Sequence, residues 1–294
     1  MELMVAMAIT TVIVTVLVSI TAIAMDTWNR SRAELRAARQ AKAMVDSMAS
    51  DFESMVTRRG NTYEWLSAIN SNSLPGEKLT STNAAELIMF SAATDRYDGE
   101  IGINNTNDKG GDVSCVAYRL KYKDPIVKSG TVFKTFVLNR LLVNPDNTFN
   151  DLLGKADLPI AFSKYSSKLD EVQNFVCENV FQFTITFHIE ATRVTDTTSE
   201  LVPVSVTIGQ TNTGQVTQSL KIKGTGLEVV VAGASVTPEQ LAAGRIASVE
   251  ISLTVLTDFA IDQLRKRPFS EKDKPEFLAK NSYQYTKRVS IPSM

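Results

Sequence analysis

The residues of this chain best suited to bind a metal ion lie between positions 95 and 112. This segment is rich in acidic and amide side chains, among them Asp95, Asp98, Glu100, Asn104, Asn107, Asp108 and Asp112. Such oxygens are the ligands that Ca²⁺ prefers. An EF-hand loop is excluded, because Lys109 precedes Gly110 where an acid or amide is needed. Asn, Asp and Gly also gather in turns, so we expect a turn here, with bound calcium as the alternative.

Nothing else in the chain has the spacing of a catalytic or cofactor site. His188 is the only histidine, and it lies on the polar face of an alternating strand, where we expect a plain exposed residue. No nucleophile elbow, phosphate-binding loop or Cys/His metal spacing accompanies it. The formal net charge is −1 and the pI is about 6.0, and no basic patch is interleaved with aromatic residues. The sequence therefore predicts no enzyme, no cofactor and no nucleic-acid partner.

The most informative stretch is the uncharged apolar run from residue 3 to residue 25. A helix needs roughly 20 apolar residues to cross a bilayer, so we predict a transmembrane helix over residues 1–25. A cleaved signal peptide is the alternative, since Ala22 and Ala24 fit the small-residue pattern before a cleavage site. Signal peptides, however, have a basic start and a shorter apolar core, whereas this chain has Glu2 at its start.

Beyond Asp26 the apolar residues continue as a stripe with helical spacing. Its members are Trp28, Leu35, Ala38, Ala41, Val45, Met48, Phe52 and Met55. Steps of three and four residues are typical of a helix with one buried face. No Gly or Pro occurs before Gly60. We therefore predict one continuous helix whose amphipathic extension, residues 26–59, packs Val45, Met48, Phe52 and Met55 against the rest of the protein.

This N-terminal region resembles type IV pilins and the pseudopilins of type II secretion. The chain begins MELMVAMAI, which is similar to the mature family pattern Phe-Thr-Leu-x-Glu-Leu followed by an apolar stretch. The segment from Trp28 to Met55 resembles the helix that carries the head domain, particularly in minor pseudopilins of the J class. Met1 stands where the fourth mature residue is expected, so a basic leader ending in glycine, encoded upstream, would support this resemblance.

The resemblance gives Glu2 a role in assembly. Glu2 matches the glutamate that lies five residues after the family's cleavage point. An unpaired charge at the edge of an apolar run is costly to bury. In the family, the N-terminal amine of a neighbouring subunit can supply the counter-charge during filament assembly. The alternative is that Glu2 is an ordinary polar flank at the membrane surface.

The remaining residues, 60–294, predict one β-rich head domain. The length and flanks of an apolar run predict a buried strand near 87–92. Alternating apolar residues predict strands near 113–122, 132–143, 181–190, 202–208, 220–222, 249–255 and 283–291. Such half-buried strands are typical of antiparallel sheets. We expect short helices after Thr237, over 258–267 and as a turn within 62–69, and a charged linker over 270–274. The expected fold class is α+β: a long N-terminal helix packed on an antiparallel, pilin-like head.

Cys115 and Cys177 form an even pair in a domain that we expect to be exported. One disulfide is therefore allowed, and it would stabilise the head by roughly 4 kcal/mol in the chain-entropy model. Two separate buried thiols are the alternative. Because both cysteines lie in strand-like segments, we predict that they are close enough to bond.

Together these features predict a structural subunit rather than an enzyme. We expect a minor or tip pseudopilin of a type IV pilus-like or type II secretion filament. Its partners would be other pilin-like subunits, inner-membrane lipid and the secretion or pilus machinery. A single-pass anchored binding domain is the alternative. Arginines after the span favour a cytoplasmic flank, but the family's leader is also basic, so we expect the head outside the bacterial inner membrane. Those arginines also suit solvent, anionic lipid headgroups or an acidic partner.

Overall fold

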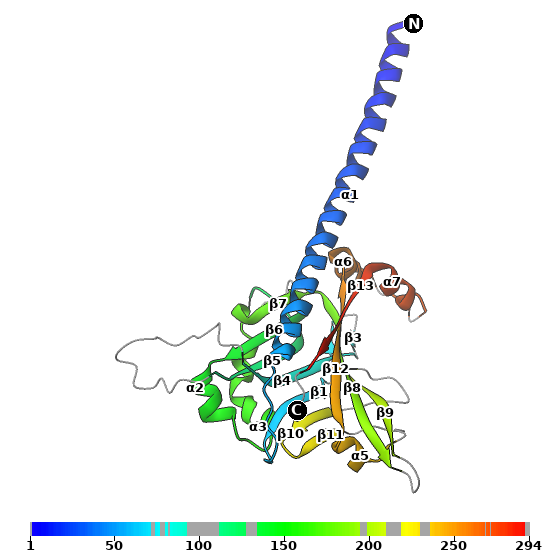
Figure 1. Ribbon diagram of the computed structural model, residues 1–294. Coiled ribbons are helices and arrows are strands. Elements are labelled where there is room, and N and C mark those ends of the chain that lie inside the picture. Colours follow the sequence, from blue (N-terminus) through cyan, green and yellow to red (C-terminus); the bar gives the residue numbers. More distant parts are fainter. Residues whose placement is uncertain are drawn as a thin grey trace, which may run out of the picture.

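The computed structural model consists of one long helix that projects from a head built on two antiparallel sheets (Figure 1). It describes residues 2–71, 74–76, 80–81, 83–92, 112–127, 134–194, 199–209, 219–229, 236–267, 269–270 and 272–291. Helix α1 (Glu2–Glu53) contains 52 residues and is about 78 Å long at 1.5 Å per residue. The predicted α+β class, with a long N-terminal helix and antiparallel sheets, is confirmed.

Within the described residues the larger sheet has seven strands. In spatial order they are β11 (Gly226–Val229), β10 (Ser219–Lys223), β1 (Glu64–Asn70), β4 (Ala85–Ser91), β5 (Ser114–Lys123), β6 (Thr135–Val143) and β7 (Phe175–Glu178). All neighbours pair antiparallel. The strands predicted near 113–122 and 132–143 correspond to β5 and β6, which are neighbours in this sheet.

The smaller sheet has four strands in the described chain. They are β13 (Ser282–Ser290), β12 (Arg245–Leu256), β8 (Val180–Val194) and β9 (Ser199–Ile208), also antiparallel. The chain passes from β7 of the larger sheet to β8 of the smaller one at Asn179, whose φ of 60° turns the backbone sharply. A two-stranded ribbon is formed by β2 (Leu74–Pro75) and β3 (Thr80–Ser81).

Short helices cover the ends and one face of the sheets. They are α2 (Pro145–Asn147), η1 (Thr148–Leu152), α3 (Leu158–Phe162), η2 (Ser163–Tyr165), α4 (Ser166–Leu169), η3 (Val172–Asn174), α5 (Pro238–Ala242), α6 (Asp258–Lys266) and α7 (Lys274–Asn281). The predicted start of α5 is confirmed, because Thr237 and Gln240 form a reciprocal capping box. Helix α6 also lies where it was predicted.

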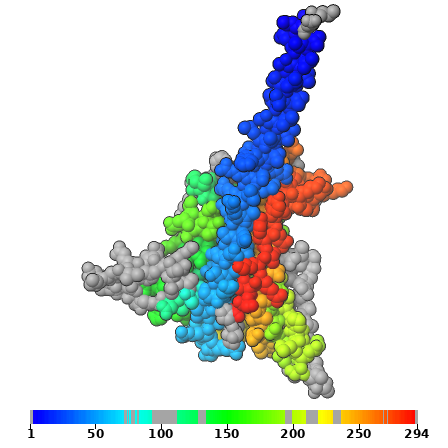
Figure 2. All heavy atoms as spheres, turned by 45° about the horizontal axis from the view of Figure 1, so that its top comes forward, coloured from blue at the N-terminus to red at the C-terminus, as the bar shows by residue number. Residues whose placement is uncertain are grey.

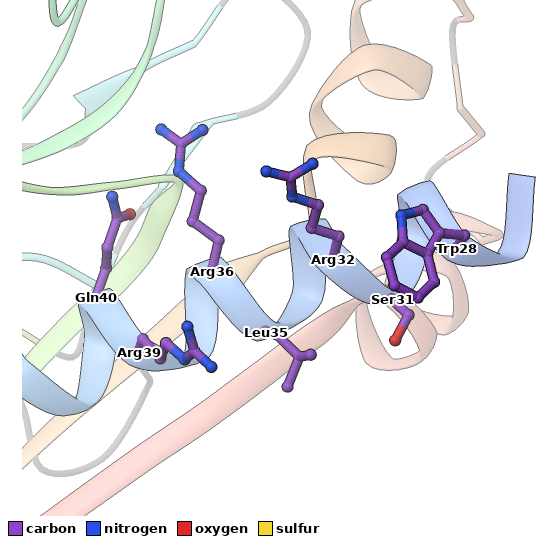
Figure 3. A pocket seen from close by; sticks show the side chains of 7 residues that line it. All are labelled: Trp28, Ser31, Arg32, Leu35, Arg36, Arg39 and Gln40. Atoms are coloured by element: carbon purple, nitrogen blue, oxygen red, sulfur yellow. The ribbon is translucent and has the colours of Figure 1, made fainter. Parts of the chain in front are cut away.

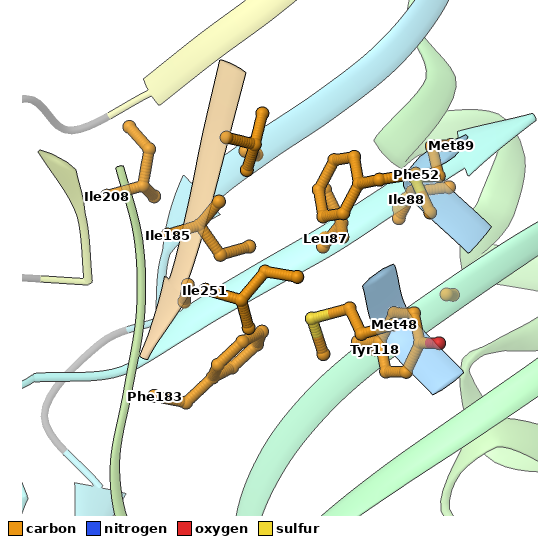
Figure 4. Close-up of a cluster of buried hydrophobic side chains, with 14 of the residues drawn as sticks. Met48, Phe52, Leu87, Ile88, Met89, Tyr118, Phe183, Ile185, Ile208 and Ile251 are labelled. Carbon is orange, nitrogen blue, oxygen red and sulfur yellow. The ribbon is translucent and has the colours of Figure 1, made fainter. Parts of the chain in front are cut away.

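The core lies between the two sheets and the second half of α1 (Figure 4). Met48 and Phe52 of α1 are buried together with Leu87 of the larger sheet and Phe183 of the smaller one. The Phe52 and Phe187 rings meet edge to face, with centroids 6.4 Å apart. In Figure 2, β13 runs alongside the lower part of α1. The helix therefore contributes to the core of the head.

One sequence-based expectation about the head is wrong, and one of its helices was not predicted. The helical turn predicted within 62–69 is strand β1, which lies between β10 and β4. Its first five residues are all buried, so it lacks the alternation by which half-buried strands are recognised. The charged linker predicted at 270–274 is followed by helix α7, which was not predicted and in which Phe277 stacks near Phe269 with centroids 4.3 Å apart.

Candidate membrane-anchoring and assembly surface

The first half of α1 is an apolar rod, residues 3–25, that projects away from the rest of the described chain. Every described side chain from Leu3 to Trp28 is exposed. Residues 3–25 span about 35 Å at 1.5 Å per residue, against roughly 30 Å for the hydrocarbon core of a bilayer. This helix is long and apolar enough to cross a membrane, as the sequence predicted.

The hydroxyl groups in this rod are satisfied by the helix itself. The bonds run from Thr10 to Ala6, Thr11 to Met7, Thr15 to Thr11, Ser19 to Thr15, Thr21 to Leu17 and Thr27 to Ile23, each from a side-chain hydroxyl to the carbonyl one turn earlier, at 2.8–2.9 Å. Hydrocarbon offers no hydrogen-bonding partner. The internal bonds therefore make these six polar residues compatible with lipid.

Helix α1 enters the head at Ala41. From there its buried residues are Ala41, Met44, Val45, Met48, Ala49, Asp51 and Phe52. The four residues predicted to pack on the head, Val45, Met48, Phe52 and Met55, are all buried. Trp28 and Leu35, which the same stripe predicted to be buried, are instead 70% and 56% exposed. The stripe therefore begins before the buried part of α1 does, although the head already meets this part of the helix at Arg30, which lies over the Phe259 ring, and at Arg36, which pairs with Glu178.

A buried ion pair fixes the helix to the larger sheet. Arg140 Nη2 donates to Asp51 Oδ1 at 2.7 Å, and Arg140 Nε donates to Asp51 Oδ2 at 2.8 Å and to Tyr118 Oη at 2.9 Å. Tyr118 in turn donates to Asp51. The Arg140 and Asp51 side chains are only 7% and 5% exposed. Such a bidentate pair fixes both distance and orientation.

The electrostatics of this cluster follow from its burial. Burial is the largest cause that raises the pKa of Tyr118, and the nearby Asp51 carboxylate adds to it. Burial alone would lower the pKa of Arg140, but the hydrogen bond that Arg140 donates to Asp51 and the charges of its neighbours outweigh burial and raise that pKa. Arg140 therefore stays charged, and α1 is held to β5 and β6 by a paired charge rather than by apolar contact alone.

Two further ion pairs, both more exposed than the Asp51–Arg140 pair, connect α1 to the head. Arg36 Nη2 lies 2.8 Å from Glu178 Oε1 of β7, and Lys287 Nζ of β13 lies 2.7 Å from Asp46 Oδ1. The hydrogen bond from Lys287 lowers the pKa of Asp46, whereas burial raises the pKa of Glu178. The helix is thus tied to an edge strand of each sheet.

The predicted disulfide is wrong: Cys115 and Cys177 are both free and buried. Cys115 pairs with Val143 of β6, whereas Cys177 pairs with Leu138 on the other side of that strand. The two cysteines are therefore separated by two strand spacings, about 10 Å, and by about 17 Å along the strands. Bridged Cα atoms lie roughly 4.4–6.8 Å apart. The thiols serve as small apolar core groups.

The other predicted site residues are accounted for as follows. The side chain of Glu2 and the oxygen-rich segment, apart from Asp112, lie outside the described residues. Elsewhere in the described ranges no group of three His, Cys, Asp or Glu side chains is placed to hold a metal. His188 lies on the polar side of β8, with Nδ1 3.0 Å from Ser205 Oγ.

The Asp51–Arg140 pair was not predicted from the sequence. The available signal was that Asp51 interrupts the apolar stripe and Arg140 interrupts an apolar strand.

Comparisons of the chain with protein-family models, with curated proteins and with solved structures each gave no match.

Proposed function

We propose that this protein is a membrane-anchored structural subunit of a pilin-like filament, of the minor or tip pseudopilin type. The observation that carries the proposal is the division of α1. One half is an exposed apolar rod, and the other half is part of the core of the head. The rod serves first as the membrane anchor and then as the surface by which subunits associate.

The rod has the composition needed for association between helices. Lipid supplies little hydrophobic drive between spans, so close packing of small and hydroxyl residues must supply it. Residues of this kind recur along the rod at Ala6, Ala8, Thr11, Thr15, Ser19 and Ala22. Because each hydroxyl already bonds within its own helix, these positions can meet a neighbouring helix without leaving an unpaired donor.

The rigid joint between rod and head also suits a repeating assembly. Subunits in a regular filament must hold their heads at one angle to their helices. The Asp51–Arg140 pair and the flanking Arg36–Glu178 and Asp46–Lys287 pairs oppose rotation of α1 against the sheets. A domain that was only tethered to the membrane would need no such joint, and a flexible linker would serve it.

The proposal places the anchor in the bacterial inner membrane and the head in the periplasm or outside the cell. The partners are other pilin-like subunits and the secretion or pilus machinery, and no catalysis is involved. Glu2 is the residue proposed to meet a positive partner, namely the N-terminal amine of an adjacent subunit, because a charge at that depth is costly unless it is paired.

The test is site-specific crosslinking in membranes of the full chain from its natural start, wild type against Glu2→Ala. Asp26→Ala is the matched control, since it removes a carboxylate from the other end of the same span. A filament subunit should lose crosslinks to its neighbours in Glu2→Ala, keep them in Asp26→Ala and stay in the membrane in both. Equal crosslinking of wild type and Glu2→Ala would favour a lone anchored domain.

A further inference from the structure

A groove of about 480 Å³ lies on α1 between the apolar rod and the head. Its lining comes from successive turns of one face of the helix: Trp28, Ser31, Arg32, Leu35, Arg36, Arg39 and Gln40. Figure 3 shows Arg32, Arg36 and Gln40 projecting in the same direction from the helix.

The groove carries positive charge that the described chain does not neutralise. Its lining contains three arginines and no carboxylate. Arg36 reaches Glu178 at 2.8 Å, but Arg32 and Arg39 have no ion-pair partner within the described ranges. Arg30, by contrast, pairs with Glu34 at 3.1 Å and stacks over the Phe259 ring. Of the four arginines of α1, the two without an ion-pair partner in the described chain therefore both lie in the groove.

The groove begins where the membrane surface must lie if the rod spans the bilayer. Trp28 is three residues beyond Met25, about 4.5 Å along the axis, and Arg32 is about 10 Å beyond it. The polar headgroup layer extends roughly 5–8 Å on each side of the hydrocarbon, and helical side chains lean back toward the N-terminus. The guanidinium of Arg32 thus reaches the headgroups, whereas Arg39, about 21 Å beyond Met25, lies above them.

We propose that the lower end of this groove binds the headgroup of an anionic phospholipid, with its phosphate at Arg32 beside Ser31 and its glycerol region against Trp28. The inference rests on the membrane anchoring in the proposed function. The occupant is indicated by the continuity of the groove with the span, by the unpaired arginines and by a tryptophan at interface depth, where such rings are enriched. The bound lipid fixes the height and rotation of α1 before any partner engages it.

The experiment measures which lipid lies next to Trp28. The full-length protein is placed in nanodiscs of phosphatidylcholine and phosphatidylglycerol in which either the one or the other lipid carries brominated acyl chains, at equal mole fractions. Bromine quenches tryptophan fluorescence on contact. Trp65, the second of the two tryptophans, is buried in the head and supplies a constant background. Near-ultraviolet circular dichroism verifies that each variant is folded.

Wild type should show about five-fold enrichment of phosphatidylglycerol over phosphatidylcholine at Trp28, the fold-change that corresponds to about 1 kcal/mol for one arginine at an anionic surface. Arg32→Ala should abolish the enrichment. Arg39→Ala is the matched control, because it removes the same charge from the same helix face about 10 Å farther from the bilayer, and it should keep most of the enrichment.

Each other outcome overturns a defined part of the account. Equal quenching by both brominated lipids would refute the lipid site, leave the anchoring intact and point to an acidic protein partner or to solvent around these arginines. Equal losses in Arg32→Ala and Arg39→Ala would show a diffuse positive field instead of a site. Absence of quenching by either lipid would refute the membrane anchor itself, and with it the proposed function.

Discussion

The two halves of helix α1 have the same backbone but opposite surroundings. Residues 3–25 are apolar on every side and exposed on every side. From Ala41 to Phe52 the apolar residues occupy one face, and that face is buried between the sheets while the opposite face carries charge. A helix that is apolar all round needs a wholly apolar environment, whereas a striped helix needs one apolar neighbour. Under the proposed anchoring, the helix therefore passes from lipid to water near Trp28.

Removal of the rod should have the largest effect. A chain lacking residues 1–25 is expected to move entirely from the membrane fraction to the soluble fraction, because it loses every residue of the span. The head should keep its melting temperature, since its core begins at Ala41. Fractionation followed by a thermal melt of the soluble product measures both. If the head unfolds or stays in the membrane, the claim that residues 1–25 serve only as the anchor is wrong.

Disruption of the buried ion pair should be among the costliest single changes in the head. Arg140→Ala leaves the Asp51 carboxylate buried and unpaired, which typically costs about 3–5 kcal/mol of unfolding free energy. Lys287→Ala is the control, because it breaks a more exposed pair with Asp46, for which a cost of about 0.2–1 kcal/mol is typical. Chemical denaturation of the two variants should give clearly separated midpoints. Similar midpoints would mean that the joint does not hold the helix.

Side-chain truncations compare the buried and the exposed part of the apolar stripe within the same helix. Phe52→Ala removes a fully buried ring that contacts Phe187, and we expect a loss of about 3–5 kcal/mol. Leu35→Ala removes a side chain that is mostly exposed, so a change within about 0.5 kcal/mol is expected. Both are measured by urea denaturation. A large loss at Leu35 would indicate that the head covers more of α1 than described.

The smallest effect concerns the two thiols. Burial raises the pKa of Cys177 to about 12 and raises that of Cys115 further. Between pH 9 and 12 the unfolded chain therefore releases thiol protons that the folded head retains, and unfolding becomes easier as the pH rises. Intact mass after alkylation near neutral pH should show no adduct in the native head and two adducts in denaturant. A mass lower by two hydrogens, with no adducts after denaturation, would instead support the predicted disulfide.

The sequence predicted the features that depend on local periodicity. The unbroken course of α1, the alternating strands such as β8 and β12, and the capped start of α5 all follow from the order of neighbouring residues, although α1 ends at Glu53 and the predicted extension ran to residue 59. Strand β1 was missed because burial on both faces removes alternation. Helix α7 was missed because its packing depends on the contact of Phe277 with Phe269.

Contacts between residues that are far apart in the sequence could not be predicted from local periodicity. Asp51 and Arg140 are 89 residues apart, and only the folded sheet brings them together. The cysteine error has the same origin, since an even count says nothing about strand register. Trp28 and Leu35 match the period of the buried stripe, but periodicity does not show where the covering sheets end. The anchoring surface could thus be predicted locally, whereas its attachment to the head could not.

The most direct test of the central claim, that one helix passes from lipid through water into a protein core, is a cysteine accessibility scan along α1 in membranes. Single cysteines replace Ala8, Val14, Ile20, Ser31, Leu35 and Ala49 in turn, and a membrane-impermeant maleimide reports exposure to water. The buried Cys115 and Cys177 provide an unreactive background. We expect no labelling at the first three positions, labelling at Ser31 and Leu35, and none at Ala49. Labelling of Val14 at the rate of Ser31 would place the rod in water and contradict the account.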